Sequence, residues 1–360
     1  MLSSKTSLPC QVATIQPYLP FPTPVVQAFK GMTASAHTIS VIVPTYRRTA
    51  DLARCLAALD QQQLRPEEVL ITYREEDVET CTYLARADRP CADARLILCT
   101  EPGVVFALNR AFDEVKSDFF AITDDDSVPH PEWLQRIVTH FMSDPSAAGV
   151  GGKDHVFVSN EHRWIEGSES IVGIVSWLGN AVGSHHVGVG PPRYVHTLKG
   201  VNIAFRRSAF GSLRLDGRLR GKGAQVGWEM QLCFAMLSQG YKLIYDPAVL
   251  VDHIIGSRPI EEHRVKFNPA SHFDEAFNRT LLMLEYLAKQ PHGWFRRLAF
   301  MSLLGLRGSR KFPGLLLLSH GLLTRYPDTW HRFRTTSAAY LAALRASKAE
   351  GALSGLASVA

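Results

Sequence analysis

The sequence is poor in cysteine, and its six cysteines form no CxxC pair. Their density is too low for a small domain held together by disulfides. Several of them fall inside apolar periodic segments, so we interpret them as reduced and structural. This usage is typical of the cytoplasm, where we expect the protein to reside.

The chain also lacks an apolar run long enough to span a membrane. Its most apolar stretches, LAFMSLLGL and FPGLLLLSHGLL, are separated by RGSRK, and each falls short of the roughly 20 residues that a spanning helix requires. The amino end shows no charged-then-apolar secretory pattern, and PYLPFPTP at residues 17–24 would break a helix. We therefore expect residues 1–36 to form an extended or flexible tail.

Acidic residues are almost absent from Tyr286–Lys348, where eleven Lys and Arg accompany a single acid, Asp328. A basic segment of this kind can meet nucleic acid or anionic lipid. No nucleic-acid motif accompanies it, so we expect no nucleic-acid partner. Short apolar pieces between basic residues favour a hairpin that lies in the surface of the inner face of the cell membrane. The alternative is a helical subdomain whose leucines pack on the rest of the chain. The basic residues concerned are Arg296, Arg297, Arg307, Arg310, Lys311 and Arg325.

Four short, apolar, β-branched segments are each followed by apolar residues at helical spacing. These segments are Ile39–Pro44, Glu68–Tyr73, Ala94–Cys99 and Asp118–Thr123. Repeated strand–helix units predict an α/β fold with a mostly parallel, Rossmann-like sheet and helices on both faces. Ligands of such sheets bind beyond the carboxyl ends of the strands.

Three adjacent carboxylates, Asp124, Asp125 and Asp126, follow the fourth segment at this ligand-binding edge. Their mutual repulsion is costly unless a cation or a bound substrate compensates it. Carboxylate oxygens are hard ligands that suit Mg²⁺ or Mn²⁺ together with a diphosphate. The alternative is an acidic helix cap, in which Ser127 or an Asp precedes a helix with Pro131 in its first turn.

Four motifs in order together resemble glycosyltransferase family 2. They are SVIVPTYRR, TDDDSVPHPEWL, LKGVNIAFRRSAF and VGWEMQLCFAMLSQGYKLIYDPAVLVDH, and they extend over Ile39–His253. The resemblance implies the nucleotide-sugar-binding GT-A fold. We accordingly expect a catalytic domain at residues 37–260 and a helical, basic region, with a possible role at the membrane, at residues 261–360.

The resemblance also implies which residues bind the donor. Asp126 would hold the metal, and Asp124 and Asp125 would lie on the nucleotide side. The family has an Asp-rich turn after the second strand that holds the nucleotide base, but this chain reads TYREED there. Arg74, Glu75 or Asp77 could recognise the base in its place. The alternative is that this turn is only a solvated charged turn. The remaining donor-side residues are Pro44, Thr45, Tyr46, Arg47, Gly103 and Asn109, of which the last two could instead only shape a helix start.

The acceptor hydroxyl needs a general base on the side opposite the leaving diphosphate. Glu229 in VGWEMQLC matches the second acid of the family's Glu-Asp motif, with Trp228 at the first position. The alternative is a first-turn acid that only favours the helix macrodipole. His253 matches a metal-binding histidine of some relatives, and it and Asp252 are the next candidates for the base.

Other residues of the second half could contact the sugar or the diphosphate. Gly200 would permit close approach, Asn202 could donate to a sugar, and Trp177 could stack on one. His185 and His186 stand in the same loop as Trp177, and Arg258 could meet the diphosphate. Each could equally be structural.

These features predict a metal-dependent, inverting glycosyltransferase that moves a sugar from a nucleoside-diphosphate sugar to a saccharide or lipid-linked saccharide. A sugar-phosphate nucleotidyltransferase would require a Gly-rich phosphate loop after the first strand, and PTYRRTADL contains none. A non-catalytic scaffold of a polysaccharide assembly is the second alternative, and the presence of both Asp126 and Glu229 argues against it.

Overall fold

The computed structural model describes residues 37–158, 163–164, 167–255, 267–323 and 328–357. These residues belong to one unit, Ser35–Ala360. The expected tail at residues 1–36 and Arg258 lie outside the described residues.

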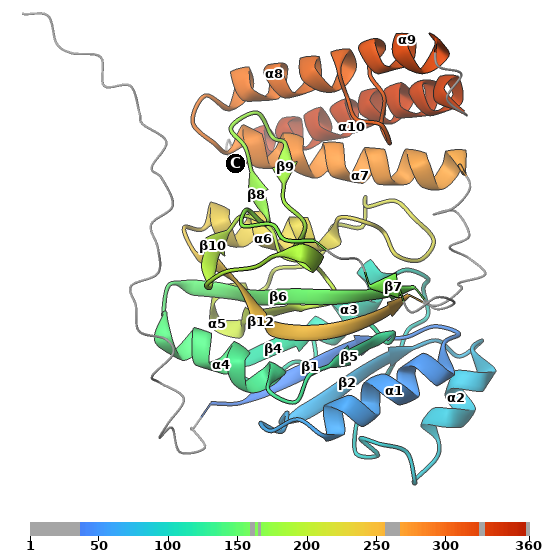
Figure 1. Cartoon of the computed structure of the whole chain (residues 1–360), viewed down its shortest axis with the longest axis vertical. Helices are drawn as coiled ribbons and strands as arrows, with labels where there is room; N and C mark the ends of the chain where they lie inside the picture. Colours follow the sequence, from blue (N-terminus) through green and yellow to red (C-terminus); the bar gives the residue numbers. More distant parts are fainter. Residues whose placement is uncertain (1–36, 159–162, 165–166, 256–266, 324–327, 358–360) are drawn as a thin grey trace, which may run out of the picture. The chain divides into compact units, whose positions relative to one another are not determined.

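The amino-terminal half consists of the four predicted strand–helix units (Figure 1). Strands β1, β2, β3 and β4 pair in the order β4-β1-β2-β3, all in parallel. Their carboxyl ends therefore meet at one edge of the sheet. The elements are β1 (Ile39–Pro44), α1 (Thr49–Asp60), β2 (Glu68–Tyr73), α2 (Val78–Leu84), β3 (Arg95–Leu98), α3 (Val104–Phe112) and β4 (Phe119–Ile122).

The second half extends the same sheet in the order β10-β12-β6-β11-β4. Strand β11 is antiparallel to both β4 and β6, whereas β6 and β12 are parallel to each other. The elements that follow β4 up to the end of the sheet are β5 (Ser127–Pro129), α4 (Trp133–Ser143), β6 (Ala147–Val158), β7 (Arg163–Trp164), β8 (Ile174–Val175), β9 (Ala181–Val182), η1 (His185–Val187), β10 (Arg193–Val195), β11 (Ile203–Arg206), α5 (Arg207–Phe210), α6 (Trp228–Ser238) and β12 (Lys242–Ile255).

Both faces of the sheet are covered, as neighbouring residues of β4 show. Phe119 stacks on Phe141 of α4, with ring centroids 4.6 Å apart. Phe120 instead meets Phe112 of α3 and Phe210 of α5. Successive side chains of a strand point to opposite faces, so α4 covers one face and α3 the other. The predicted α/β fold with a mostly parallel sheet is therefore confirmed.

In the described part of the chain, four helices follow the sheet: α7 (Pro269–Ala288), α8 (Gly293–Leu306), α9 (Leu315–Leu323) and α10 (Thr329–Ala357). Asn268 caps α7 by accepting from Ser271 N, and Pro269 occupies its first turn, where a missing N–H has no cost. Phe277 and Leu281 of α7 pack on Tyr340 of α10 in a small apolar cluster. Among the described residues, none of the helices combines the length and the apolar character that membrane crossing requires.

Candidate active site

The acidic cluster occupies a tight turn at the carboxyl end of β4. Ser127 Oγ donates to the carbonyl of Asp124 at 2.8 Å, and Thr123 Oγ1 lies 2.5 Å from Ser127 Oγ. Asp125 and Asp126 are buried, whereas Asp124 is half-buried. The next helix begins only at Trp133 and Ser127 starts β5, so the alternative of an acidic helix cap is not realised.

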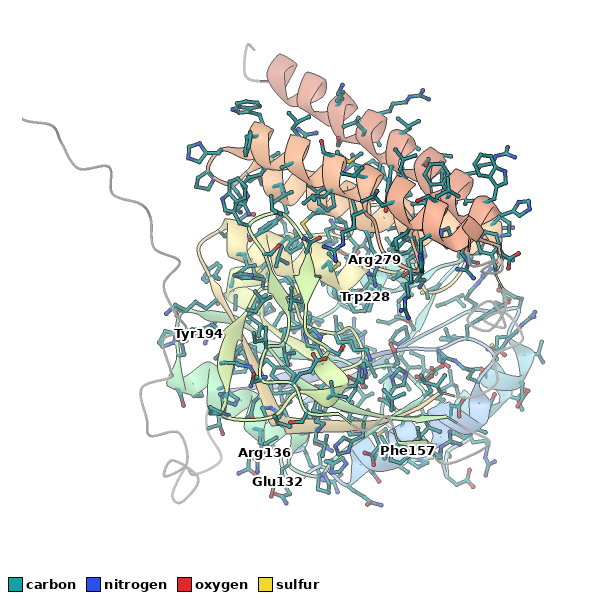
Figure 2. All side chains as sticks on the ribbon, turned by 45° about the horizontal axis from the view of Figure 1, so that its top comes forward. Glu132, Arg136, Phe157, Tyr194, Trp228 and Arg279 are labelled. Atoms are coloured by element: carbon teal, nitrogen blue, oxygen red, sulfur yellow. The ribbon has the colours of Figure 1, made fainter. Side chains whose placement is uncertain are left out.

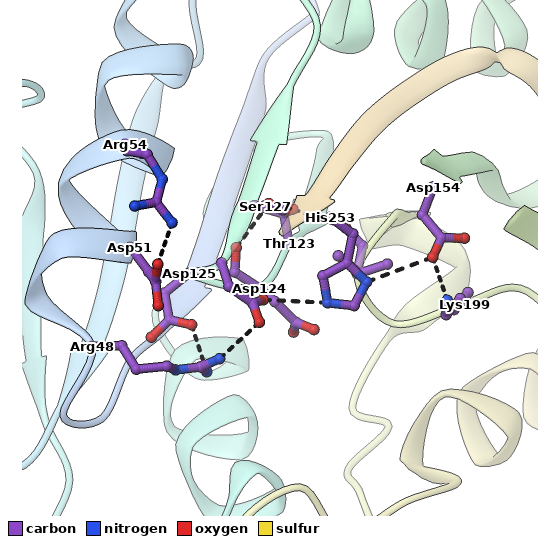
Figure 3. A network of polar contacts seen from close by, with 12 residues as sticks. Arg48, Asp51, Arg54, Thr123, Asp124, Asp125, Ser127, Asp154, Lys199 and His253 are labelled. Carbon is purple, nitrogen blue, oxygen red and sulfur yellow. Dashed lines mark hydrogen bonds and ion pairs between the residues drawn. The ribbon is translucent and has the colours of Figure 1, made fainter. Parts of the chain in front are cut away.

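Arg48 provides the nearest positive charge to the cluster. Its guanidinium lies 2.5 Å from Asp125 Oδ1 and 3.0 Å from Asp126 Oδ2 (Figure 3). Burial nevertheless raises the pKa of Asp125 to about 7, against the opposing effect of Arg48. Among the described residues, the guanidinium of Arg48 therefore offsets only part of the cost of burying Asp125.

His253 of β12 joins the cluster to a second buried acid, Asp154 of β6. Its Nε2 lies 3.4 Å from Asp126 Oδ1 and its Nδ1 3.6 Å from Asp154 Oδ2, and Lys199 pairs with Asp154 on the far side (Figure 3). Burial would lower the pKa of His253, but the two carboxylates outweigh it and raise that pKa to about 9. The polar chain therefore runs from Arg48 through Asp126, His253 and Asp154 to Lys199.

The residues present fit a divalent cation. Asp124, Asp126 and His253 each place a ligand atom within 4.8 Å of the others. Neither ring nitrogen of the buried His253 makes a hydrogen bond of normal length, and a bound ion would satisfy one of the two. A set of two carboxylates and one imidazole suits Mg²⁺ less well than a set of oxygen ligands alone, and it is also acceptable to Mn²⁺.

The loop after β1 lies at the same edge of the sheet. The ring of Tyr46 is flanked by two guanidinium groups, 5.0 Å away for Arg47 and 5.3 Å away for Arg74. Thr45 is buried and donates its N–H to Thr72 on β2, and Pro44 ends β1. The loop therefore gathers an aromatic ring and two guanidinium groups at this edge of the sheet.

The TYREED turn divides its acids between the interior and solvent. Asp77 is buried, caps α2 by accepting from Thr80 N, and accepts from the backbone N–H of Arg47, a residue with φ of 56°. Its carboxylate therefore holds the first loop in shape and is not directed at a base. Glu75 is exposed, and Arg74 pairs with Glu76.

Gly103 and Asn109 connect α3 to the segment that precedes α6. Asn109 donates to Leu215 O at 3.0 Å and accepts from Leu215 N at 2.8 Å. Gly103 precedes α3 with φ of 108°, where a Cβ would lie 2.3 Å from Gln225 Oε1. These contacts favour a structural role for both residues over contact with a nucleotide.

Three of the four predicted sugar-binding residues, Gly200, Asn202 and Trp228, are packed into the protein. Asn202 is fully buried and joins three partners, because its Oδ1 accepts from Trp133 and its Nδ2 donates to the carbonyls of Lys153 and Val249. Trp228 is buried against Gly200, where a Cβ would lie 2.4 Å from the indole ring. The environment of Asn202 favours a structural role over the predicted contact with a sugar.

Trp177 is exposed, and its contacts are with α8. Arg296 stacks over the indole at 5.5 Å and donates to the carbonyl of Trp177 at 2.8 Å, and Phe295 approaches its ring at 5.8 Å. None of these neighbours belongs to the acidic cluster. His185, in the same loop, donates from Nε2 to the carbonyl of Thr197 at 2.8 Å, and its own carbonyl accepts from the hydroxyl of Tyr245 at 2.7 Å.

Glu229 occupies the first turn of α6 and is half-buried. Burial raises the pKa of its carboxyl, and the charge of Asp124 adds to the rise, while Arg279 and Lys199 oppose it. Glu229 directly follows Trp228 of α6, which Figure 2 labels together with Arg279 of α7. The carboxyl of Glu229 therefore feels the charge of Asp124, a member of the acidic cluster.

Three members of the polar chain, Arg48, Asp154 and Lys199, were not assigned by sequence reasoning. Asp154 lies inside β6, two residues after the small and apolar run AAGVGG, and an acid within such a strand was the available signal. Lys199 and Arg48 gave no comparable signal, because each is one basic residue in a polar loop and its partner lies 45 residues or more away in the chain.

Comparison with known proteins supports these observations. Residues 36–275 match the family described as "Glycosyltransferase like family 2". The chain is similar to a glucosyl-dolichyl phosphate glucuronosyltransferase of Haloferax volcanii, with 23% identity over 64% of this chain and 72% of that protein.

Two solved structures share the fold. One is a mannosyltransferase from Pyrobaculum calidifontis in complex with GDP-Man and Mn²⁺, with a TM-score of 0.50, 16% identity, and coverage of 86% of this chain and 87% of that one. The other is GalNAc-T7 with UDP, GalNAc and Mn²⁺, with a TM-score of 0.50, 14% identity, and coverage of 81% of this chain and 58% of that one. The GT-A fold that the sequence predicts is confirmed.

Proposed function

This chain belongs to glycosyltransferase family 2, and we propose that it transfers a sugar, with inversion, from a nucleoside-diphosphate sugar to a lipid-linked saccharide with the help of Mg²⁺ or Mn²⁺. One observation carries the proposal. Ligand atoms of Asp124, Asp126 and His253 converge within 4.8 Å of one another at the carboxyl edge of a parallel sheet, where ligands of such sheets bind.

The proposed metal ligands are Asp126, His253 and Asp124. When bound, the ion would stabilise the negative charge that develops on the departing diphosphate. The mannosyltransferase and GalNAc-T7 structures both contain Mn²⁺, which supports this assignment. Arg48 would hold Asp126 in place from the opposite side, since it contacts Oδ2 while His253 approaches Oδ1.

The proposed nucleotide site is the loop after β1 together with the start of the TYREED turn. Tyr46 offers a ring for stacking, and Arg47 and Arg74 offer cations for the diphosphate or the base. Asp77 fixes the loop through the N–H of Arg47. Pro44 and Thr45 set the point at which the chain leaves the sheet.

Glu229 is the proposed general base. A carboxyl whose pKa is raised by burial is a stronger base than an exposed one, and it remains ionised near neutral pH as long as that pKa stays below the working pH. It would accept the proton of the acceptor hydroxyl as the bond to the anomeric carbon forms. Trp228 and Gly200, which pack beside it, would define the acceptor side of the site.

The lipid-linked nature of the acceptor rests on the relative from Haloferax volcanii, whose name specifies a glucosyl-dolichyl phosphate substrate. An acceptor of this kind resides in a membrane. We therefore also propose that residues 261–360 dock the catalytic domain, residues 37–260, on the inner face of the cell membrane, whose anionic lipids attract basic segments.

The exposed apolar side chains of α8 support this docking. Trp294 is 74% exposed and Leu298, one turn later, is 59% exposed. Phe295 is exposed as well and extends the patch to Trp177. We call Trp177, Trp294, Phe295 and Leu298 the α8 patch.

The basic residues of α8 and of the segment that follows it are divided between interior and surface. Arg296 is buried under Trp177, so it holds the patch together and cannot meet lipid. Arg307 and Arg310 are exposed and remain available to anionic headgroups. Arg325 lies outside the described residues.

The decisive experiment is calorimetric titration of the full chain with a panel of nucleotide sugars, with and without Mn²⁺. We expect one donor to bind measurably only with the metal, and Asp126→Ala to lose that dependence. Asp88→Ala, which alters an exposed acid on another loop, is the matched control and should behave as wild type. Equal donor affinity in Asp126→Ala and wild type under both conditions would contradict the metal assignment, and donor binding without turnover on any acceptor would favour the scaffold alternative.

A further inference from the structure

A second group of metal-ligating side chains lies on three paired strands, apart from the proposed catalytic cluster. It consists of His130, which follows β5, His155 of β6 and Asp252 of β12. Asp252 is paired in register with His155 on one side and with Val128 on the other. Since His130 stands two residues beyond Val128, all three side chains share one face of the sheet.

This face is opposite to the one that carries His253. Neighbouring residues of a strand alternate, so Asp252 and His253 of β12 point to opposite sides. His155 and Asp154 of β6 alternate in the same way, and Asp154 is the residue that contacts His253. The two clusters are thus arranged back to back across the strands β6 and β12.

The distances within this second cluster match a tetrahedral metal site. Both histidines approach the same oxygen, Asp252 Oδ1, from His130 Nε2 at 3.1 Å and from His155 Nδ1 at 3.3 Å. Ligand bonds of about 2.0 to 2.1 Å around tetrahedral Zn²⁺ place neighbouring ligand atoms about 3.3 Å apart. All three ligand atoms lie within 4.8 Å of one another, so an ion can contact them after small side-chain adjustments.

The backbone around His130 is held in place independently of any ion. Its N–H donates to Leu250 O of β12 at 3.1 Å, and its carbonyl accepts from the side chain of Gln62 at 2.9 Å. Gln62 follows α1 and also accepts from Leu134 N through its Oε1. A site fixed in this way needs little reorganisation to bind an ion.

The composition of the cluster distinguishes it from the catalytic one. Two imidazoles and one carboxylate favour Zn²⁺ and related transition metals over Mg²⁺, which prefers oxygen ligands. The side chains of His130 and Asp252 are 40% and 30% exposed, so an ion can enter from solvent and a water can complete the tetrahedron.

We propose that His130, His155 and Asp252 form a second metal site that binds Zn²⁺ or a similar transition-metal ion. An ion here would link β12 to β6 and to the residue after β5. Asp126 directly precedes β5, and His253 directly follows Asp252. The ion would therefore brace, from the back, the two segments that carry Asp126 and His253.

The test is equilibrium titration of the metal-stripped full chain with Zn²⁺ alone, using calorimetry to count the ions bound. Four proteins separate the two clusters: wild type, Asp126→Ala, the double variant His130→Ala/His155→Ala, and the triple variant that combines all three substitutions. We expect the double variant to bind one Zn²⁺ fewer than wild type, and the triple variant one fewer than Asp126→Ala. His331→Ala, which removes an exposed histidine of α10, should leave the stoichiometry unchanged.

A second readout keeps the test independent of catalysis and of folding defects. Zn²⁺ should raise the melting temperature of Asp126→Ala but not that of the triple variant, and the single variant His155→Gln replaces the double variant if the latter melts without cooperativity. Co²⁺ in the Asp126→Ala protein should give the intense visible absorption of four-coordinate cobalt. Equal Zn²⁺ stoichiometry in wild type and the histidine variants would overturn the proposal and leave Asp252 as a hydrogen-bond acceptor for two histidines.

Discussion

At the scale of single residues, charge compensation shapes the candidate site. Asp125 and Asp126 are buried, and one guanidinium, that of Arg48, contacts both. Removing one partner of a buried pair leaves the other charge without solvent or counter-charge, which is costly. Arg48 is therefore expected to matter for stability, and not only for the position of Asp126.

We predict that Arg48→Met destabilises the metal-free protein by about 1 to 3 kcal/mol, the usual cost of an unsatisfied buried polar group. Mn²⁺ should then raise the melting temperature of this variant more than that of wild type, because the ion restores positive charge beside the carboxylates. Chemical unfolding and thermal melting, each with and without Mn²⁺, measure both effects.

The matched control for this prediction is Arg54→Met. Arg54 pairs with Asp51 on the surface of α1, and an exposed pair of this kind contributes about 1 kcal/mol at most. If Arg48→Met and Arg54→Met cost the same, or if Mn²⁺ stabilises wild type and Arg48→Met equally, the compensating role of Arg48 is wrong.

A second residue-scale prediction concerns Glu229. Glu229→Gln keeps the shape of the side chain but cannot accept a proton, so transfer should fall by about 10² to 10⁴ while donor affinity stays near the wild-type value. Wild-type transfer should rise with pH through the pKa of Glu229, which burial raises above the ordinary value for Glu, because only the ionised carboxylate is a base. Turnover under saturating substrates between pH 4 and 8 measures both.

Glu79→Gln provides the control, since Glu79 is also an acid in the first turn of a helix, α2, and contributes only to the macrodipole there. Its turnover should equal that of wild type. A Glu229→Gln protein that melts normally and retains more than roughly a tenth of the wild-type rate is inconsistent with a base, whose loss costs more. In that case the base has to be sought elsewhere.

Sequence reasoning found the acids of the site but not all of their partners. Asp124 and Asp126 follow a strand that periodicity locates, so their place at the ligand-binding edge of a parallel sheet could be predicted. Glu229 was located by the family motif and lies in the first turn of α6. Arg48 lies in the loop after β1, and periodicity does not indicate that its side chain reaches Asp125 and Asp126 after β4. Asp154 could not be paired with His253 in advance, because the register between β6 and β12 decides which side chains face one another. The same register places Asp252, considered as an alternative base, on the face away from His253.

At the scale of elements, the strands and helices of the amino-terminal half are those that hydrophobic periodicity predicts. The strand order of the second half is harder to predict from sequence, since β11 inserts between β4 and β6 and runs antiparallel to both. Local pattern cannot indicate such an insertion, because antiparallel and parallel partners use similar apolar residues. Pairing at long range is therefore the part of the fold that sequence reasoning left open.

An element-scale prediction follows from the contact between α7 and α10. His272 of α7 is buried, its Nε2 lies 2.7 Å from Thr336 Oγ1 of α10, and Arg332 and Lys311 lie nearby. Burial, aided by these cations and opposed by Glu275, lowers the pKa of His272 to about 4. The folded state therefore disfavours protonation of this ring.

The direction of the resulting pH dependence of stability follows from the unfolded chain, in which the histidine binds the proton more readily, with a pKa of about 6.5. Stability from His272 is fully present above about pH 6.5 and is lost as the pH falls toward 4, for a total of about 3 kcal/mol. Unfolding by urea at several pH values should show this slope in wild type. His272→Gln retains a hydrogen-bonding group but does not titrate, so it should reduce the slope of unfolding free energy against pH. The exposed control His331→Gln should leave that slope unchanged. An unchanged slope in His272→Gln would show that the ring of His272 does not contribute to the pH dependence.

At the scale of the whole molecule, the chain combines a family 2 catalytic domain with a set of helices rich in basic residues and exposed apolar side chains. Monomeric proteins rarely leave two large aromatic residues side by side in solvent without a binding partner. Trp294 and Phe295 have ring centroids 5.8 Å apart, and both are exposed. If the acceptor is lipid-linked, an exposed apolar surface of this kind would dock the enzyme on the membrane that holds the acceptor and so concentrate the two together.

We predict that the full chain binds anionic vesicles through the α8 patch, and that the double variant Trp294→Ser/Leu298→Ser binds at least about tenfold more weakly. Each substitution removes apolar area that would be buried at the interface, and burial of a large apolar side chain contributes about 1.5 to 3 kcal/mol, where 1.4 kcal/mol corresponds to a factor of ten. Co-sedimentation with neutral and anionic vesicles at low and high salt measures the binding. Added salt should weaken the wild-type interaction, since the attraction of Arg307 and Arg310 to anionic lipid is screened.

Val78→Ser on α2, which removes a side chain that is equally exposed but lies outside the α8 patch, should bind as wild type. Transfer gives an independent check: the double variant should have a raised KM for an acceptor embedded in vesicles and an unchanged KM for a soluble acceptor analogue, because the two substituted residues of α8 do not belong to the proposed catalytic cluster. Equal vesicle binding by the double variant and Val78→Ser would leave the α8 patch without a membrane role.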